Sequence, residues 1–103
     1  MQKIKKPKPV KGNICLSGYV EIPELRYSAV IGALDKHIAL TRAEAGCIYF
    51  SVERSKTDMY RLEVDEIFAD SAAFDYHQRR TEMSAWAEIT KGIKRQFEVR
   101  EIV

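Results

Sequence analysis

The sequence predicts an α+β domain with the ferredoxin-like βαββαβ order of elements, in which helices cover one face of a four-stranded antiparallel sheet. Three observations indicate this class. Apolar residues alternate with period two in several short segments, and they recur at three- and four-residue steps in the segments between them. The chain has 103 residues, of which 46% are hydrophobic, which suits one domain and leaves no room for two independent cores.

The first strand and the first helix are predicted between residues 14 and 46. The apolar face of this strand consists of Ile14, Leu16, Gly18, Val20 and Ile22. Pro23 ends the strand and can begin a helix, because its fixed backbone angle suits the first helical position. The apolar face of the helix consists of Tyr27, Val30, Ile31, Leu34, Ile38 and Thr41. Gly46 is expected to end the helix in a left-handed conformation.

A hairpin is predicted next, because period two resumes after Gly46 and the polar segment 55–58 is short. One face of the second strand carries Ile48, Phe50 and Val52. One face of the third strand carries Tyr60, Leu62, Val64, Glu66 and Phe68. Glu66 is a carboxylate on an otherwise apolar face, so it requires a partner when buried.

Two shorter helices and a last strand follow. Asp70 is the expected N-cap of a helix from Ser71 to about Arg79, in which Phe74 and His77 share a face. Thr81 is the expected cap of a second helix, whose periodic residues are Met83, Trp86, Ala87, Thr90 and Ile93. Apolar residues of the last strand are Phe97, Val99 and Val103.

Helices on one face leave the other face of the sheet uncovered. The residues expected there include Cys15, Tyr19, Tyr49 and Ile67. An exposed apolar face normally marks a contact with a partner, so we expect a homodimer formed through the sheets. Cys15 and Cys47 are expected on strands that are not neighbours, beyond the distance that a disulfide can bridge.

The positive charge is concentrated at the N-terminus. Residues 1–13 hold five lysines and no acidic residue, whereas residues 14–103 carry a net charge of −3. We interpret residues 1–13 as a basic disordered arm before a domain of residues 14–103. No basic stripe with interleaved aromatic residues continues into the domain, so a nucleic-acid partner is not expected. No apolar stretch is long enough for a membrane span or a signal peptide, and the two cysteines suggest reduced thiols in a cytoplasm.

Several catalytic signatures are absent from the sequence. It has no glycine-rich phosphate loop, no CxxC motif and no nucleophile elbow. The two histidines, His37 and His77, lie forty residues apart, which is not a metal-ligand spacing. These absences exclude most hydrolase and kinase functions, and they predict no metal site.

Two segments carry more specific patterns. Residues 37–50 read HIALTRAEAGCIYF, and residues 65–77 read DEIFADSAAFDYH. The first resembles the helix-to-strand junction of the antibiotic biosynthesis monooxygenase (ABM) family, His-(Val/Ile)-x-x-(Ser/Thr)-Arg-x-Glu-x-Gly-Cys-x-x-Phe. The second is similar to that family's Glu-x-aromatic-x-Asp-x-x-Ala-(Phe/Leu)-x-x-His segment. The resemblance covers about residues 14–103, with the elements in the same order.

The resemblance implies a dimeric α/β barrel, in which each ferredoxin-like subunit has a pocket between its helices and its sheet. Some members of the family oxidise quinols or related phenols with O2 and use no metal, flavin or haem. The function implied for this chain is therefore a cofactor-independent monooxygenase that acts on a small quinol or polyphenol. Such a protein must remove a proton, exclude water and hold the resulting anion beside oxygen.

The resemblance also suggests site residues. His77 matches the family's histidine and is a candidate general base. Glu66 is expected to assist His77 or to polarise a substrate hydroxyl, or else to pair with Arg42, Arg79 or Arg80. Candidate substrate-binding residues are Phe68, Phe74, Trp86 and His37. A purely structural role in the core stays open for both histidines and for the aromatic residues.

The sequence departs from the family after His77. Many members continue with Ser-Pro-His, whereas this chain has Arg80, Thr81 and Glu82. The missing second histidine favours an alternative function, a non-catalytic ABM-fold module that binds a small aromatic ligand or serves in assembly. A weaker alternative is an isomerase or aldehyde-handling relative. Haem degradation fits poorly, because Gly18 and Phe68 stand near the positions where haem-degrading relatives have Asn and Trp.

Overall fold

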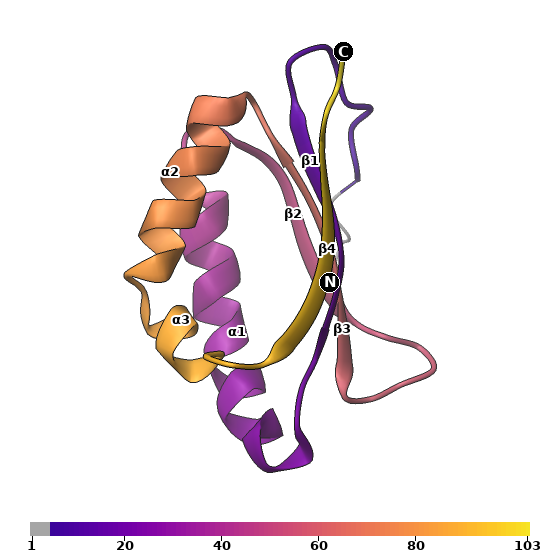
Figure 1. Cartoon of the computed structure of the whole chain (residues 1–103), viewed down its shortest axis with the longest axis vertical. Helices are drawn as coiled ribbons and strands as arrows, with labels where there is room; N and C mark the ends of the chain where they lie inside the picture. Colours follow the sequence, from indigo (N-terminus) through magenta and orange to yellow (C-terminus); the bar gives the residue numbers. More distant parts are fainter. Residues whose placement is uncertain (1–4) are drawn as a thin grey trace.

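Helices cover a single face of a four-stranded antiparallel sheet in the computed structural model, which describes residues 5–103 (Figure 1). The strands are β1 (Ile14–Glu21), β2 (Cys47–Arg54), β3 (Arg61–Phe68) and β4 (Lys94–Glu101). The helices are α1 (Tyr27–Arg42), α2 (Ser71–Glu82) and α3 (Ala85–Ile89), and a 3₁₀ turn (Glu24–Arg26) precedes α1. The strand order is β2-β3-β1-β4. The predicted ferredoxin-like α+β fold is therefore confirmed.

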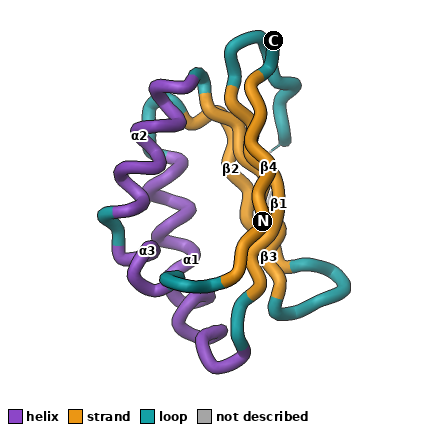
Figure 2. The backbone as a smooth tube through the Cα atoms, viewed as in Figure 1, coloured by secondary structure: helices purple, strands orange, loops and turns teal. Residues whose placement is uncertain are grey.

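The main core lies between the inner face of the sheet and the helices, which form one layer (Figure 2). Its buried members are Leu16, Val20, Ile22, Val30, Leu62, Val64 and Ile93. The strand residues among them follow the predicted period of two, because alternate side chains of a strand point to the same face. Phe50 and Phe68 are also buried on this face.

The helix α1 ends earlier than predicted. Its last residue is Arg42, and the cap residue Ala43 keeps a right-handed backbone. Gly46 lies beyond the helix and is not among the glycines with positive φ, so the prediction of a left-handed stop at Gly46 is wrong. The lack of space around position 46 explains why a glycine is found there. A Cβ atom there would lie 2.3 Å from the Cβ atom of Ala73 in α2, and the Gly46 carbonyl accepts a hydrogen bond from the Ala69 amide at 2.8 Å.

Two other local predictions are corrected. The strand β2 contains an irregularity between Cys47 and Tyr49, which leaves Ile48 out of the pairing and 44% exposed. The bulge adds one residue and interrupts the alternation that placed Ile48 on the inner face. The helix α2 begins after the predicted N-cap, Asp70, whose carboxylate accepts a bond from the Ala73 amide at 2.8 Å, but it continues to Glu82. The cap of α3 is therefore Ser84, not Thr81.

The N-terminal segment returns along the outer face of the sheet, opposite the helices (Figure 1). Lys6 Nζ lies 2.8 Å from Asp65 Oδ2, and the Gly12 amide donates to the Ile102 carbonyl. Ile67 on this face has no exposed surface, whereas Tyr19 and Tyr49 are half-buried. The disorder expected for residues 1–13 stays a prediction, and residues 1–4 lie outside the described part of the chain.

Cys15 and Cys47 are both free, and β3 separates their strands, as predicted. Burial, together with the nearby carboxylates Glu44 and Glu66, raises the pKa of Cys47 to about 11, which keeps this thiol protonated. Within residues 5–103, no helix has the length and apolar character needed to cross a membrane.

Candidate active site

A cavity of about 190 Å³ lies between the inner face of the sheet and the three helices. Apolar side chains of β1, β2 and β3 form its floor. Its polar and aromatic lining includes His37, Glu66, His77, Thr81, Trp86 and Arg95. It brings together four of the six residues that the sequence suggested for the site: His37, Glu66, His77 and Trp86.

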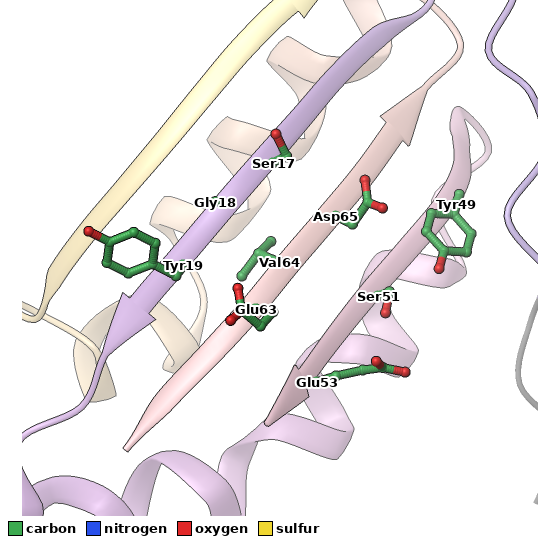
Figure 3. A pocket seen from close by; sticks show the side chains of 9 residues that line it. All are labelled: Ser17, Gly18, Tyr19, Tyr49, Ser51, Glu53, Glu63, Val64 and Asp65. Atoms are coloured by element: carbon green, nitrogen blue, oxygen red, sulfur yellow. The ribbon is translucent and has the colours of Figure 1, made fainter. Parts of the chain in front are cut away.

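The outer face of the sheet carries a wider, shallower hollow of about 370 Å³ (Figure 3). Tyr19 and Tyr49 stand on opposite sides of it, with Ser17, Glu63 and Asp65 between them. No histidine and no basic side chain is among the residues that line this hollow. Of the two, only the inner cavity places a histidine next to a largely apolar space between helices and sheet, so we place the candidate active site there.

His77, in the middle of α2, is 4% exposed and is held on three sides. Its Nδ1 atom lies 3.0 Å from Glu44 Oε2, so Nδ1 carries the hydrogen in the neutral ring and donates it to the carboxylate. The ring lies against Phe50 and Phe68, with centroid distances of 5.9 and 4.7 Å. The Nε2 atom, which then has the free lone pair, is 3.9 Å from Glu66 Oε1.

Glu44 lies in the loop between α1 and β2, and it was not identified from the sequence. Its Oε2 atom accepts hydrogen bonds from both His77 and Arg80 Nε, the latter at 2.6 Å. Arg80 also donates to Thr41 Oγ1 at 2.9 Å. The arginine thus compensates a carboxylate that is 9% exposed. The available signal was Glu44 itself, which occupies the glutamate of the Arg-x-Glu-x-Gly pattern in residues 42–46.

Glu66, on β3, is 6% exposed and faces the cavity without a cation to neutralise it. Burial raises the pKa of Glu66 to about 8, and the negative charges of Glu44 and Asp65 act in the same direction. Its Oε1 atom has no hydrogen-bond partner among the described residues. Of the arginines suggested as partners, Arg42 donates to the Phe50 carbonyl and Arg80 to Glu44. At neutral pH Glu66 is therefore a protonated acid beside the cavity, and its Oε1 atom is buried without a hydrogen-bond partner.

His37 and Trp86 form the wall opposite the sheet. Their rings stack with a centroid distance of 4.4 Å and an interplanar angle of 7°. Burial lowers the pKa of His37 to about 4, and the nearby His77 and Arg80 lower it further. His37 is therefore neutral at neutral pH, and both rings of the stacked pair line the cavity.

The other two predicted residues lie behind the site. Phe68 is fully buried under the His77 ring, and Phe74 packs on Phe68 with a centroid distance of 5.7 Å. Neither is among the residues that line the cavity. Both fix the position of the histidine from behind, and their predicted stacking on a substrate ring stays a prediction.

The fold and the site together define a small ferredoxin-like domain whose inner cavity is lined by two histidines, a tryptophan and the buried carboxylate of Glu66. The family model described as antibiotic biosynthesis monooxygenase matches residues 14–89. The chain belongs to this family.

Several solved structures share this fold. A candidate antibiotic biosynthesis monooxygenase from Nitrosomonas europaea has a TM-score of 0.78 at 13% identity, with 92% of this chain and 94% of that chain covered. A Bacteroides thetaiotaomicron protein described as a possible oxidoreductase has a TM-score of 0.72 at 21% identity, with 90% and 100% covered. A Shewanella oneidensis protein has a TM-score of 0.66 at 27% identity, with 90% and 91% covered. No match was found among the curated proteins.

Proposed function

We propose that this protein is a cofactor-independent monooxygenase that oxidises a small quinol or polyphenol with O2 in the inner cavity. The observation that carries the proposal is the free Nε2 side of His77, which faces a protonated Glu66 across a 3.9 Å gap at the cavity wall. Membership of the ABM family supports it, as does the description of one structural neighbour as a possible oxidoreductase.

His77 is the proposed general base. The Glu44 carboxylate holds the Nδ1 hydrogen, which leaves the Nε2 lone pair to take the proton of a phenolic hydroxyl. Glu44 also stabilises the imidazolium that forms, because the new positive charge lies 3.0 Å from its oxygen. Glu44 is therefore a positioning residue that acts through His77.

Glu66 serves as a neutral donor beside the developing phenolate. A protonated carboxyl donates a hydrogen bond to the substrate oxygen and adds no negative charge that would oppose it. The electron-rich anion then reacts with O2. One oxygen atom replaces a ring hydrogen and the other leaves as water, while the quinol becomes a hydroxyquinone and supplies all the electrons. No external reductant is needed.

The size of the cavity suits a substrate with one aromatic ring. An apolar cavity of about 150 Å³ accommodates benzene, and this one measures about 190 Å³. The stacked pair of His37 and Trp86 supplies aromatic contacts for the ring. Closure of this space by the ring excludes water, which strengthens the hydrogen bonds to the anion.

Oxygen uptake by the purified protein with a panel of hydroquinones tests the proposal. We expect turnover without added cofactor, unchanged by chelators, and a rate that falls as pH rises through about 8, because Glu66 then loses its proton. We expect His77→Ala to lower kcat by roughly 10² to 10⁴, the usual contribution of a positioned general base. Asp75→Ala, which changes an exposed residue of the same helix, is the control and should retain full activity. A folded His77→Ala protein with unchanged turnover would remove His77 from the mechanism.

A second function, a module that binds an aromatic ligand without oxidising it, is favoured by one observation. Arg80 stands where many members of the family have serine, and its bonds to Glu44 and Thr41 tie the site into the core. Ligand binding without oxygen uptake on any quinol of the panel supports this alternative.

A further inference from the structure

The cavity is open along β4. Strand pairing places Arg95, Phe97 and Val99 opposite Val20, Gly18 and Leu16, so they lie on the inner face of the sheet. Although Phe97 and Val99 are on the helix side, they are 37% and 49% exposed. The strand β4 is at the edge of the sheet. Of the three helices, α3 lies nearest to the beginning of this strand (Figure 1). Arg95 and Phe97 therefore lie at the mouth of the cavity.

Two uncharged backbone carbonyls hold the Arg95 guanidinium at this mouth. Its Nη2 atom donates to the Thr90 carbonyl at 3.0 Å, and Nε donates to the Ile93 carbonyl at 3.4 Å. These carbonyls follow the end of α3, where the helix dipole is negative. Among residues 5–103, no carboxylate forms an ion pair with Arg95. This includes the carboxylate of Glu82, which borders the same groove. The side chain is held in place, and its positive charge is uncompensated.

Unlike Arg95, the ionisable groups deeper in the cavity are neutral or have their charge compensated. Arg80 compensates Glu44, Glu66 is protonated at neutral pH, and His37 is neutral. The interior is thus suited to an uncharged ring, and the net positive charge at the wall is that of Arg95. The Nη1 group, which forms no hydrogen bond among the described residues, provides donors in the planar arrangement that matches a carboxylate.

We propose that the cavity binds an aromatic acid, with a phenol or quinol ring inside and a carboxylate substituent on the Arg95 guanidinium. The orientation of the ring, with its hydroxyl toward His77 and Glu66, rests on the proposed function. The preference for an anion rests on Arg95 alone. Arg95 is then the residue that determines specificity, and a quinol without a carboxylate is the poorer ligand.

Binding can be measured without turnover, because Trp86 is the only tryptophan and lines the cavity. The probes are 3- and 4-hydroxybenzoate and the two corresponding hydroxybenzamides, which differ in charge and hardly in size. Quenching of the Trp86 fluorescence at pH 7 gives the affinities. We expect at least one acid to bind tenfold or more tightly than its amide.

Substitutions of two arginines on β4 test whether Arg95 determines the preference for the acid. Arg95→Gln is expected to bring acid and amide within twofold of each other, whereas Arg95→Lys retains part of the preference. Arg100→Gln removes the same charge from the outer face of this strand and is expected to keep the full preference. Thermal melts confirm that each variant is folded. Equal affinities in the unaltered protein, no binding of either acid, or a preference that survives Arg95→Gln overturns the proposal.

Oxygen uptake separates this inference from the proposed function. Turnover of 2,5-dihydroxybenzamide with the same kcat/KM as 2,5-dihydroxybenzoate supports a monooxygenase and contradicts the role of Arg95. Selective binding of the acids with no oxygen uptake supports the role of Arg95 and contradicts the monooxygenase.

Discussion

The two buried glutamates at this site have opposite electrostatic environments, and this difference determines the protonation state of each. Glu44 accepts hydrogen bonds from Arg80 and His77, so its charge is compensated. Glu66 has no cationic partner other than the distant His77 ring, and burial raises its pKa to about 8. One carboxylate therefore orients the base while the other retains a proton. Environments that separate the pKa values of neighbouring acids commonly divide acid and base roles in this way.

The raised pKa of Glu66 predicts a loss of stability with rising pH. Between pH 4.5, the ordinary value, and about 8, the unfolded chain releases the Glu66 proton while the folded chain keeps it. The free energy of unfolding therefore decreases as pH rises through this window. We expect Glu66→Gln to match the unaltered protein at pH 4 and to be more stable at pH 8, on the order of 2 to 4 kcal/mol.

Urea unfolding at a series of pH values measures this effect. Glu63→Gln, an exposed position on the outer face of the same strand, is the control and should change little. A Glu66→Gln protein whose stability follows that of the unaltered chain at every pH would show that Glu66 is ionised in the folded state.

At the scale of elements, the features that can be predicted from the sequence are those that depend on neighbouring residues in the chain. A period of two places Leu16, Val20 and Leu62 in the core, and Asp70 caps α2 because its side chain reaches an amide of its own first turn. The bulge at Ile48 and the closeness of Gly46 to Ala73 depend on segments far apart in the sequence, which no local pattern contains.

The candidate site follows the same division. Glu66 is recognisable because a polar residue on an apolar face requires a partner, and His77 because it matches the family's histidine. The role of Glu44 arises only when the loop after α1 folds back onto α2. Phe68 and Phe74 have the aromatic character expected of ligand contacts, but the packing of α2 on β3 places them behind the histidine.

The contact between Gly46 and α2 gives a prediction at this scale. Gly46→Ala places a methyl group 2.3 Å from the Ala73 Cβ atom, so α2 must shift away from the loop that carries Glu44. We expect a destabilisation of about 1 to 3 kcal/mol, the usual cost of overpacking. Gly32→Ala, in α1, where the added Cβ meets nothing within 4 Å beyond the backbone of its own helix, is the control and should stabilise by roughly 0.5 to 1 kcal/mol.

Chemical denaturation measures both variants. The double variant Gly46→Ala with Ala73→Gly removes the clash and should regain part of the stability, minus the cost of a glycine in a helix. If Gly46→Ala alone were as stable as the unaltered chain, α2 would not be fixed against this loop.

The surface of the whole molecule points to a second copy of the chain, and dimerisation remains a prediction. The outer face is a shallow hollow with a tyrosine on either side (Figure 3). Tyrosines are enriched in the contacts between subunits. A monomer leaves this face open to solvent.

We therefore expect sedimentation at micromolar concentration to give twice the chain mass of 11.9 kDa. Ser17 is exposed at the middle of the outer face, where it pairs with Asp65 and Glu98, so a monomer tolerates an arginine there. Between two packed sheets the same side chain has no space, and Ser17→Arg should separate the dimer without lowering the melting temperature of the monomer. Asp35→Arg, on the exposed side of α1, makes a larger change of charge than Ser17→Arg and should nevertheless leave the dimer intact. Detection of the 11.9 kDa species alone would contradict the dimer. A Ser17→Arg dimer as stable as the original would place the contact on β4 or the helices, because only the outer face is obstructed by this change.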